Sequence, residues 1–85
     1  MAVKPNIKIT IMNINIEHIL LFKTDIRTEV DKRYIGKIME EYQIDQWTVD
    51  LQDIDCVLRI VSPILKREEV IKLIERNGYH CEELI

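Results

Sequence analysis

An α+β domain with a single antiparallel sheet is the fold class that this sequence predicts. Hydrophobic residues alternate with polar ones in several short segments, as in half-buried strands, and recur at helical spacing in two longer segments. The segments follow one another as strand, helix, strand, strand, helix and strand. With 85 residues, 47% of them hydrophobic, the chain can bury one modest core and forms one domain.

The first strand of this series is expected over residues 16–23. Its side chains alternate between two faces, with His18, Leu20 and Phe22 on one face and Ile19 and Leu21 on the other. Because both faces carry large hydrophobic groups, the pattern favours a central strand of the sheet.

Residues 1–15 are expected to form an N-terminal extension to a domain that covers residues 16–85. Ile7, Ile9 and Ile11 alternate with polar residues, which is typical of a strand. The residues before them show no periodic pattern. The extension is therefore either disordered or contributes an extra strand.

A helix is predicted over residues 28–42, where the hydrophobic period changes. Its hydrophobic stripe has six members: Val30, Tyr34, Ile35, Ile38, Met39 and Tyr42. The two tyrosines are expected in the core with the rest of the stripe. Thr28 or Asp25 is expected to cap the first turn. Gly36, within this helix, indicates either close packing against the sheet or a tolerated interruption.

Two further strands are predicted after this helix. Their inward residues are Trp47, Val49 and Leu51 in the first strand and Cys56, Leu58 and Ile60 in the second. Residues 52–55 join the two strands over a length typical of a hairpin. Ser62-Pro63 ends the second strand, because proline has no amide hydrogen to donate to a sheet.

A second helix is predicted over residues 66–76. Its inward residues are Val70, Leu73 and Ile74. Asn77-Gly78 ends this helix, since glycine readily takes the left-handed conformation that follows a helix. The last strand is expected over residues 79–84.

The order of these elements predicts a ferredoxin-like βαββαβ sandwich. In this arrangement the four strands form one antiparallel sheet in the order 4-1-3-2, and both helices cover the same face. Short connections and right-handed crossovers leave few alternatives for such a series.

Two stretches carry a resemblance to a known family. Residues 44–51 read IDQWTVDL and residues 74–79 read IERNGY, with the inward pattern of the second hairpin strand between them. With this spacing, residues 16–84 resemble the heavy-metal-associated domain of copper chaperones and metal-transporting ATPases. The resemblance implies a ferredoxin-like fold and a role in intracellular metal delivery by docking to a similar domain.

The metal loop of that family, Gly-Met-x-Cys-x-x-Cys, falls on the turn after the first strand. Thr24 and Asp25 stand where the family has glycine and methionine, and Arg27 and Val30 stand where it has its two cysteines. Together with Tyr79 they are the former metal-loop positions. Cu(I) prefers thiolate or thioether ligands, so neither Cu(I) nor any other cofactor is expected at this loop. Val30 is expected to extend the packed stripe of the helix instead.

The second hypothesis is that the turn after the first strand binds a metal ion other than Cu(I). In the expected topology the turn before the last strand lies beside the first turn, which brings His80 near Asp25 and Glu29. One histidine with carboxylates is a donor set that zinc accepts. These three residues are therefore the candidate ligands of a metal-binding or metal-transport protein that uses no cysteine pair.

ACT domains, which bind amino acids between copies, share this order of elements and provide the third hypothesis. Their glycine-bearing turn after the first strand has no counterpart here, because Gly36 and Gly78 are the chain's only glycines. Two isolated glycines also cannot form a glycine-rich phosphate-binding loop.

No catalytic set stands out, and the chain is not expected to be an enzyme. Cys56 and Cys81 both fall in the inward phase of their strands, whereas a catalytic thiol is exposed beside a base. Two distant cysteines on strands that are not neighbours argue against a disulfide and suit a reducing compartment.

The charges and the hydrophobic pattern exclude two classes of partner. A net charge of −3 provides no basic surface for nucleic acid. Polar and charged residues interrupt the hydrophobic run at residues 7–22, so neither a membrane span nor a secretory signal is expected. A soluble, cytoplasmic protein is the resulting expectation.

The helix-free face of the expected sheet carries a hydrophobic patch made of Ile19, Leu21, Val57 and Val61. Exposed patches of this kind commonly mark association surfaces. Either residues 7–11 or a second copy of the chain is expected to cover it, unless these are ordinary surface aliphatics. The leading hypothesis is therefore a heavy-metal-associated-like interaction or regulatory module, which binds a protein partner or itself. Lys23 and Arg27, near the former loop, are further interface candidates.

Overall fold

The computed structural model describes residues 18–84, which form the predicted α+β arrangement. Its elements in chain order are β1 (Ile19–Thr24), α2 (Glu29–Glu41), β2 (Trp47–Val49), β3 (Leu58–Val61), α3 (Arg67–Arg76) and β4 (Cys81–Glu83). The expectations for residues 1–15, with their alternating isoleucines, and for a first strand beginning at residue 16 lie outside the described residues.

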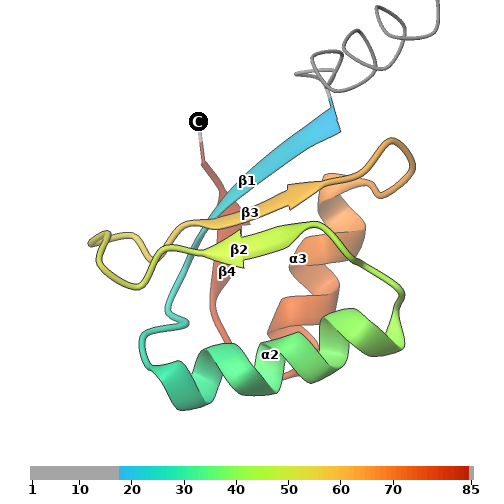
Figure 1. Ribbon diagram of the computed structural model, residues 1–85. Coiled ribbons are helices and arrows are strands. Elements are labelled where there is room, and N and C mark those ends of the chain that lie inside the picture. Colours follow the sequence, from blue (N-terminus) through green and yellow to red (C-terminus); the bar gives the residue numbers. More distant parts are fainter. Residues whose placement is uncertain (1–17, 85) are drawn as a thin grey trace, which may run out of the picture.

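The four strands form one antiparallel sheet in the order β2-β3-β1-β4, as the sequence predicted. β1 pairs with β3, where Ile19 lies opposite Val61, and with β4, where Thr24 lies opposite Cys81. Both helices lie on the same side of the sheet (Figure 1). This register brings the β1–α2 turn and the turn before β4 to one end of the sheet.

The core lies between the sheet and the two helices. Its buried members are Leu20, Phe22, Ile26, Ile35, Ile38, Met39, Ile44, Val49, Leu58, Ile60, Val70, Leu73, Ile74 and Cys81. Each large aliphatic or aromatic side chain in such a core stabilises the fold by about 1.5–3 kcal/mol relative to leaving it in water. The strand and helix periods of the sequence correctly predicted most of these positions.

Gly36 allows α2 to lie close to β2. A Cβ atom at this position would lie 3.3 Å from Cζ2 of Trp47, which is tighter than an ordinary van der Waals contact. The indole therefore packs close to the helix backbone. Of the two explanations for a glycine within α2, close packing against the sheet is the correct one.

The connection between β2 and β3 is longer than predicted. Leu51 and Cys56, expected within strands, both lie in it. The carboxylates of Asp50 and Asp53 accept hydrogen bonds from backbone N–H groups two residues later, at 3.0 and 2.7 Å. Such local bonds give the backbone an alternative to the sheet ladder. Cys56 is still buried, as its phase predicted, but with a left-handed φ of 43°.

The end of α3 matches the sequence, whereas β4 begins later than expected. Asn77 caps the helix, and its Nδ2 donates a hydrogen bond to the carbonyl of Leu73 at 2.8 Å. Gly78 follows with φ of 93°, in the left-handed region that favours glycine. Tyr79 and His80, expected in the last strand, belong to the turn that precedes it.

Candidate functional site

The turn between β1 and α2 is held by Thr24, whose side chain is buried. Its hydroxyl donates a hydrogen bond to the carbonyl of Cys56 at 2.6 Å and accepts one from the backbone N–H of Ile26 at 3.1 Å. Its own N–H donates to the carbonyl of Asp55 at 2.9 Å. These bonds fix the turn to the β2–β3 connection. Glycine, which the sequence resemblance aligns with this position, has no hydroxyl and could not make the first two of these hydrogen bonds.

Asp25 joins this turn to the turn before β4. Its Oδ1 accepts a hydrogen bond from the backbone N–H of His80 at 2.8 Å. The imidazole of His80 is engaged elsewhere, since its Nε2 lies 2.6 Å from Oε2 of Glu82. This contact is the main cause that lowers the pKa of the Glu82 carboxyl. The Asp25 side chain therefore links the β1–α2 turn to the turn before β4.

Thr28, rather than Asp25, caps α2. Its Oγ1 accepts a hydrogen bond from the N–H of Asp31 at 3.0 Å, and Oδ2 of Asp31 accepts one from the N–H of Thr28 at 3.2 Å. This reciprocal pair is a capping box. Oδ1 of Asp31 also accepts a hydrogen bond from the hydroxyl of Tyr79 at 2.9 Å.

The bond between Tyr79 and Asp31 changes the pKa of both groups. The Tyr79 hydroxyl, followed by the Thr28 cap, lowers the pKa of Asp31. Burial and then the Asp31 carboxylate raise the pKa of Tyr79 to about 12. The pair is therefore a neutral phenol bonded to a carboxylate at neutral pH, and it ties the turn before β4 to the first turn of α2.

Arg27 and Val30, the two residues that the sequence resemblance aligns with the cysteines of the family's loop, are both exposed. Val30 is 66% exposed, so the expectation that it extends the packed stripe is wrong. At about 100° per residue, Val30 lies roughly 140° around the helix from the buried Ile35. Ile26, which is 0% exposed, is the hydrophobic side chain of this turn that enters the core.

The two tyrosines expected in the core are also exposed. Tyr34 is 45% and Tyr42 is 54% exposed. Tyr34 lies beside the buried stripe, and its hydroxyl donates a hydrogen bond to Oδ1 of Asn77 at 3.1 Å. Tyr42 is the C-cap of α2, directly after the last helical residue, Glu41.

Four side chains form what we call the turn surface: Arg27, Val30, Tyr34 and Tyr79. Val30 and Tyr34 are four residues apart and therefore neighbours on α2. The rings of Tyr34 and Tyr79 have their centroids 6.3 Å apart and are tilted by 39°. Because both hydroxyls are hydrogen-bonded within the domain, the two rings are held in place.

The candidate zinc ligands come together only in part. Asp25 and His80 are in contact, but through the backbone of His80 rather than its ring. In residues 18–84, no group of three or more histidine, cysteine, aspartate or glutamate side chains is placed to hold a metal ion. The geometry around Asp25, Glu29 and His80 therefore does not favour the zinc hypothesis.

The two cysteines are free and buried, each with 2% of its surface exposed. Their inward phase was correctly predicted. Burial, with smaller contributions from Glu75 and Glu82, raises the pKa of Cys81 to about 12. Its thiol therefore stays protonated at neutral pH, whereas a metal ligand or a nucleophile needs the thiolate.

The helix-free side of the sheet carries the four aliphatic residues that the sequence placed there: Ile19, Leu21, Val57 and Val61, which we call the outer-face patch. Each is partly buried. Leu84 was not predicted to belong to this patch. Leu84 lies three residues after the inward Cys81, so strand alternation places it on the outer face. Its N–H donates a hydrogen bond to the carbonyl of Leu21 at 3.0 Å. Lys23 lies opposite Glu82 at the border of the patch, so charges flank the aliphatic area.

Two open grooves at the other end of the sheet were not predicted. They have volumes of about 380 and 300 Å³ and share Tyr42, Ile44 and Leu65. Ile64, 82% exposed, lines the larger groove. The sequence signal is a pair of aliphatic residues directly after Pro63, outside any strand or helix period.

No family model matches this chain, and neither a curated protein nor a solved structure matches it. Within residues 18–84, neither helix has the length and hydrophobicity needed to cross a membrane. Proposals for the function therefore depend on the chain's own residues and their geometry.

Proposed function

We propose that this chain is a non-enzymatic interaction domain with a ferredoxin-like fold, similar to heavy-metal-associated domains but without their thiolate metal site. The strand order β2-β3-β1-β4 and the placement of both helices on one side support the fold assignment. The proposed role in docking rests on the exposure of Arg27 and Val30, which the resemblance aligns with the family's two cysteines. The partner is a protein that docks on the turn surface.

The composition of the turn surface supports docking. Tyrosine and arginine are enriched among residues that dominate binding energy at protein interfaces. Val30 is 66% and Tyr34 is 45% exposed, so part of their hydrophobic surface is available to a partner. The hydrogen bonds of Tyr34 to Asn77 and of Tyr79 to Asp31 fix the rings before binding, which reduces the entropy lost on association.

Self-association through the outer-face patch is the second route in this proposal. Ile19 and Val61 lie opposite each other on the two central strands, so the patch is continuous across them. A domain with this face uncovered is expected to change its mass with concentration. Sedimentation equilibrium of the wild type and of Leu21→Glu measures this, and equal, concentration-independent masses exclude the route.

A Cu(I) titration tests the loss of the metal site. The wild-type chain, kept reduced and titrated in the presence of a Cu(I) chelator, is expected to leave the metal with the chelator. The reason is that Arg27 and Val30 offer no sulfur and both thiols are buried. Stoichiometric withdrawal of Cu(I) from the chelator would contradict the proposal.

Site-specific photo-crosslinking in cells tests docking on the turn surface. A benzophenone amino acid at Val30 is expected to yield a discrete crosslinked protein that disappears when Tyr34 is changed to Ala. The matched control places the same group at Ile54, which is 87% exposed in the β2–β3 connection. Identical products from both positions indicate random collisions and rule out the turn surface.

A further inference from the structure

The outer edge of β2 is unpaired within residues 18–84. β2 is the terminal strand in the sheet order, and Figure 1 shows it at the near edge, above α2. Toward β3, the carbonyl of Gln46 and the N–H of Asp50 make hydrogen bonds of 2.9 and 3.0 Å. Backbone groups alternate in direction along an antiparallel strand. Trp47 and Val49 therefore direct their N–H and C=O groups away from the sheet.

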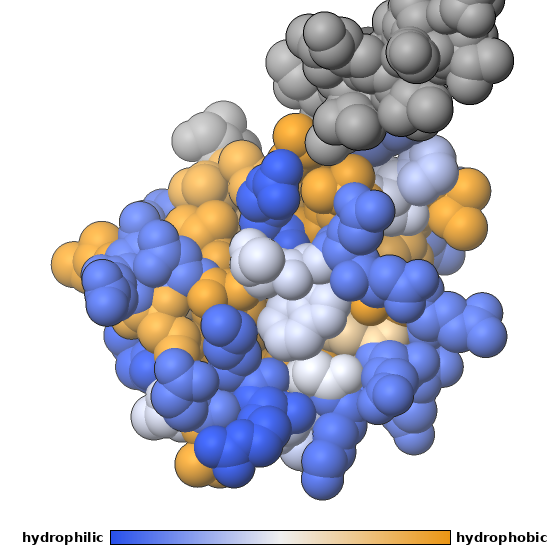
Figure 2. Space-filling view, viewed as in Figure 1, coloured by the Kyte–Doolittle hydropathy of each residue, from blue (hydrophilic) through white to orange (hydrophobic). Residues whose placement is uncertain are grey.

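A hollow of about 300 Å³ adjoins this edge. Its lining comes from α2 and β2: Glu29, Lys32, Arg33, Gly36 and Trp47. Trp47 is its one aromatic side chain and is partly exposed. On this side of the molecule a pale area of intermediate hydropathy lies in the middle, bordered by hydrophobic side chains on its left and by hydrophilic ones below it (Figure 2). The hollow therefore combines an indole with a charged rim.

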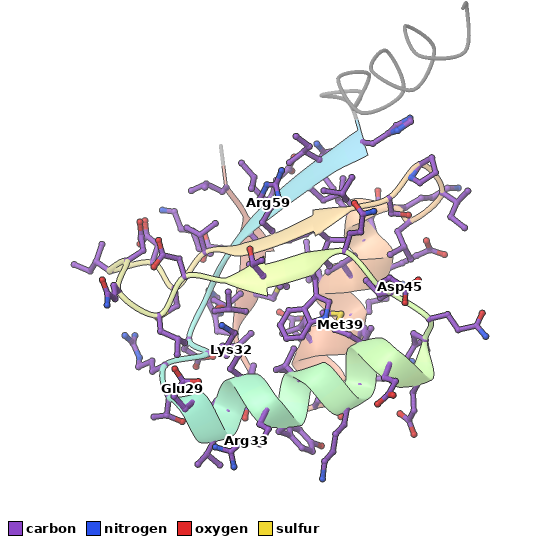
Figure 3. All side chains as sticks on the ribbon, in the orientation of Figure 1. Glu29, Lys32, Arg33, Met39, Asp45 and Arg59 are labelled. Atoms are coloured by element: carbon purple, nitrogen blue, oxygen red, sulfur yellow. The ribbon has the colours of Figure 1, made fainter. Side chains whose placement is uncertain are left out.

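The rim carries more positive than negative charge. The lining contains two cationic side chains, Lys32 and Arg33, and one carboxylate, that of Glu29; Figure 3 shows all three on the N-terminal half of α2. The ion pairs within the described residues are Arg67–Glu83 and His80–Glu82. Neither Lys32 nor Arg33 takes part in an ion pair with another of these residues, so neither charge is neutralised within residues 18–84.

From these observations we propose that the β2 edge binds an extended, acidic peptide segment of a protein partner. The segment adds to the sheet as a further strand and exchanges backbone hydrogen bonds with Trp47 and Val49. One of its hydrophobic side chains covers the indole, and an acidic side chain lies near Lys32 and Arg33. In this mode of binding the backbone bonds provide affinity and the side-chain contacts provide specificity.

This site goes beyond docking on the turn surface and does not depend on it. At about 100° per residue, Glu29, Lys32, Arg33 and Gly36 occupy a different side of α2 from Val30 and Tyr34. The two surfaces can therefore be disabled separately. β2 has three residues, so few backbone bonds are available and binding in the micromolar to millimolar range is expected.

Selection from a random heptapeptide library on the immobilised full chain identifies peptides for the test. Enriched sequences are expected to alternate hydrophobic with acidic residues. Their binding is then measured through the fluorescence of Trp47, the chain's single tryptophan. Methylation of alternate backbone nitrogens in the best peptide is expected to abolish binding, because it removes the strand hydrogen bonds. No enrichment, or an enriched set without acidic residues, overturns the proposal.

Three variants separate the site from its alternatives. Lys32→Glu is expected to weaken binding at least tenfold, whereas Lys37→Glu, the same charge change on an exposed part of α2 outside the hollow, leaves it within twofold. Tyr34→Ala is expected to bind the peptide like the wild type. Equal losses in both lysine variants mean general charge attraction, and loss in Tyr34→Ala places the peptide on the turn surface. Either result excludes the β2 edge.

Discussion

The two ends of α2 are stabilised in different ways. At the N-terminal end, Thr28 and Asp31 form a capping box, and Asp31 also accepts a hydrogen bond from Tyr79. Negative charge near this end interacts favourably with the helix dipole and stabilises the helix. At the C-terminal end, Glu40 and Glu41 lie in the last turn, where the same dipole disfavours them, and no basic residue accompanies them.

The C-terminal end depends on burial instead. Met39 is 0% and Ile44 is 7% exposed, and the N–H of Ile44 donates to the carbonyl of Met39 at 2.8 Å. Gln43 adopts φ of 58°, a left-handed conformation that costs a non-glycine residue about 1–2 kcal/mol. Side-chain hydrogen bonds thus fix the N-terminal end of α2, which bears the turn surface. Buried hydrophobic side chains and backbone hydrogen bonds hold the C-terminal end, which bears the two grooves.

The largest expected effect contrasts two aliphatic residues at the start of α2, Ile26 in the turn before the helix and Val30 in its first turn. Ile26→Ala is expected to lower the free energy of unfolding by about 2–5 kcal/mol, because it leaves a cavity at a fully buried position. Val30→Ala is expected to change it by less than about 0.5 kcal/mol, as at other exposed sites. Guanidinium unfolding measures both. Similar losses in the two variants would mean that Val30 is packed.

The next effect concerns the polar fixation of the turn. Thr24→Val is expected to cost about 1–3 kcal/mol, because it leaves the N–H of Ile26 and the carbonyl of Cys56 without their buried partner. Thr24→Ser keeps the hydroxyl and should lose less. Thr48→Val, on the exposed side of β2, is the control and should be nearly neutral. A neutral Thr24→Val would show that the turn holds without these bonds.

The sequence predicted the elements, the sheet order and the buried residues at the centre of each element. Leu20 and Phe22 in β1, and Leu73 and Ile74 in α3, were placed correctly because period alone reports which side of an element is buried. Period does not report how wide the buried side is. Val30 and Tyr34 lie at the margin of the stripe, and the small sheet does not cover them.

The polar contacts of the candidate site were beyond the reach of local patterns. Tyr79 and Asp31 are 48 residues apart, and Asp25 and His80 are 55 apart, so only the fold brings them together. The topology did predict that the two turns meet. It did not predict that Asp25 bonds to the backbone of His80, since that depends on where β4 begins.

A smaller effect, with a pH dependence, is expected from Tyr79→Phe. At pH 7 this variant should be less stable than the wild type, by less than Thr24→Val, because Asp31 loses one of several hydrogen bonds. The folded pKa of Asp31 is lowered, so its contribution is present above the ordinary value of 3.8 and is lost as pH falls through the folded value.

Urea unfolding at several pH values measures this difference. The gap between the wild type and Tyr79→Phe should narrow below pH 3.8, the ordinary pKa of an aspartate. Asp31→Asn in both backgrounds is the control, since the gap should then depend little on pH. A gap that stays constant into strong acid would mean that the Tyr79 hydroxyl acts independently of the Asp31 charge.

The smallest effect tests the dipole contrast directly. Glu41→Lys, in the last turn of α2, is expected to stabilise the fold by about 0.3–1 kcal/mol, and Glu29→Lys, in the first turn, to destabilise it by a similar amount. Both residues are exposed and both variants make the same charge change, so a general effect of net charge would shift them in the same direction. Thermal unfolding at low and high salt measures the difference, which salt should reduce. Opposite signs attribute the contrast between the ends of α2 to the helix dipole, whereas equal signs attribute it to the overall charge of −3.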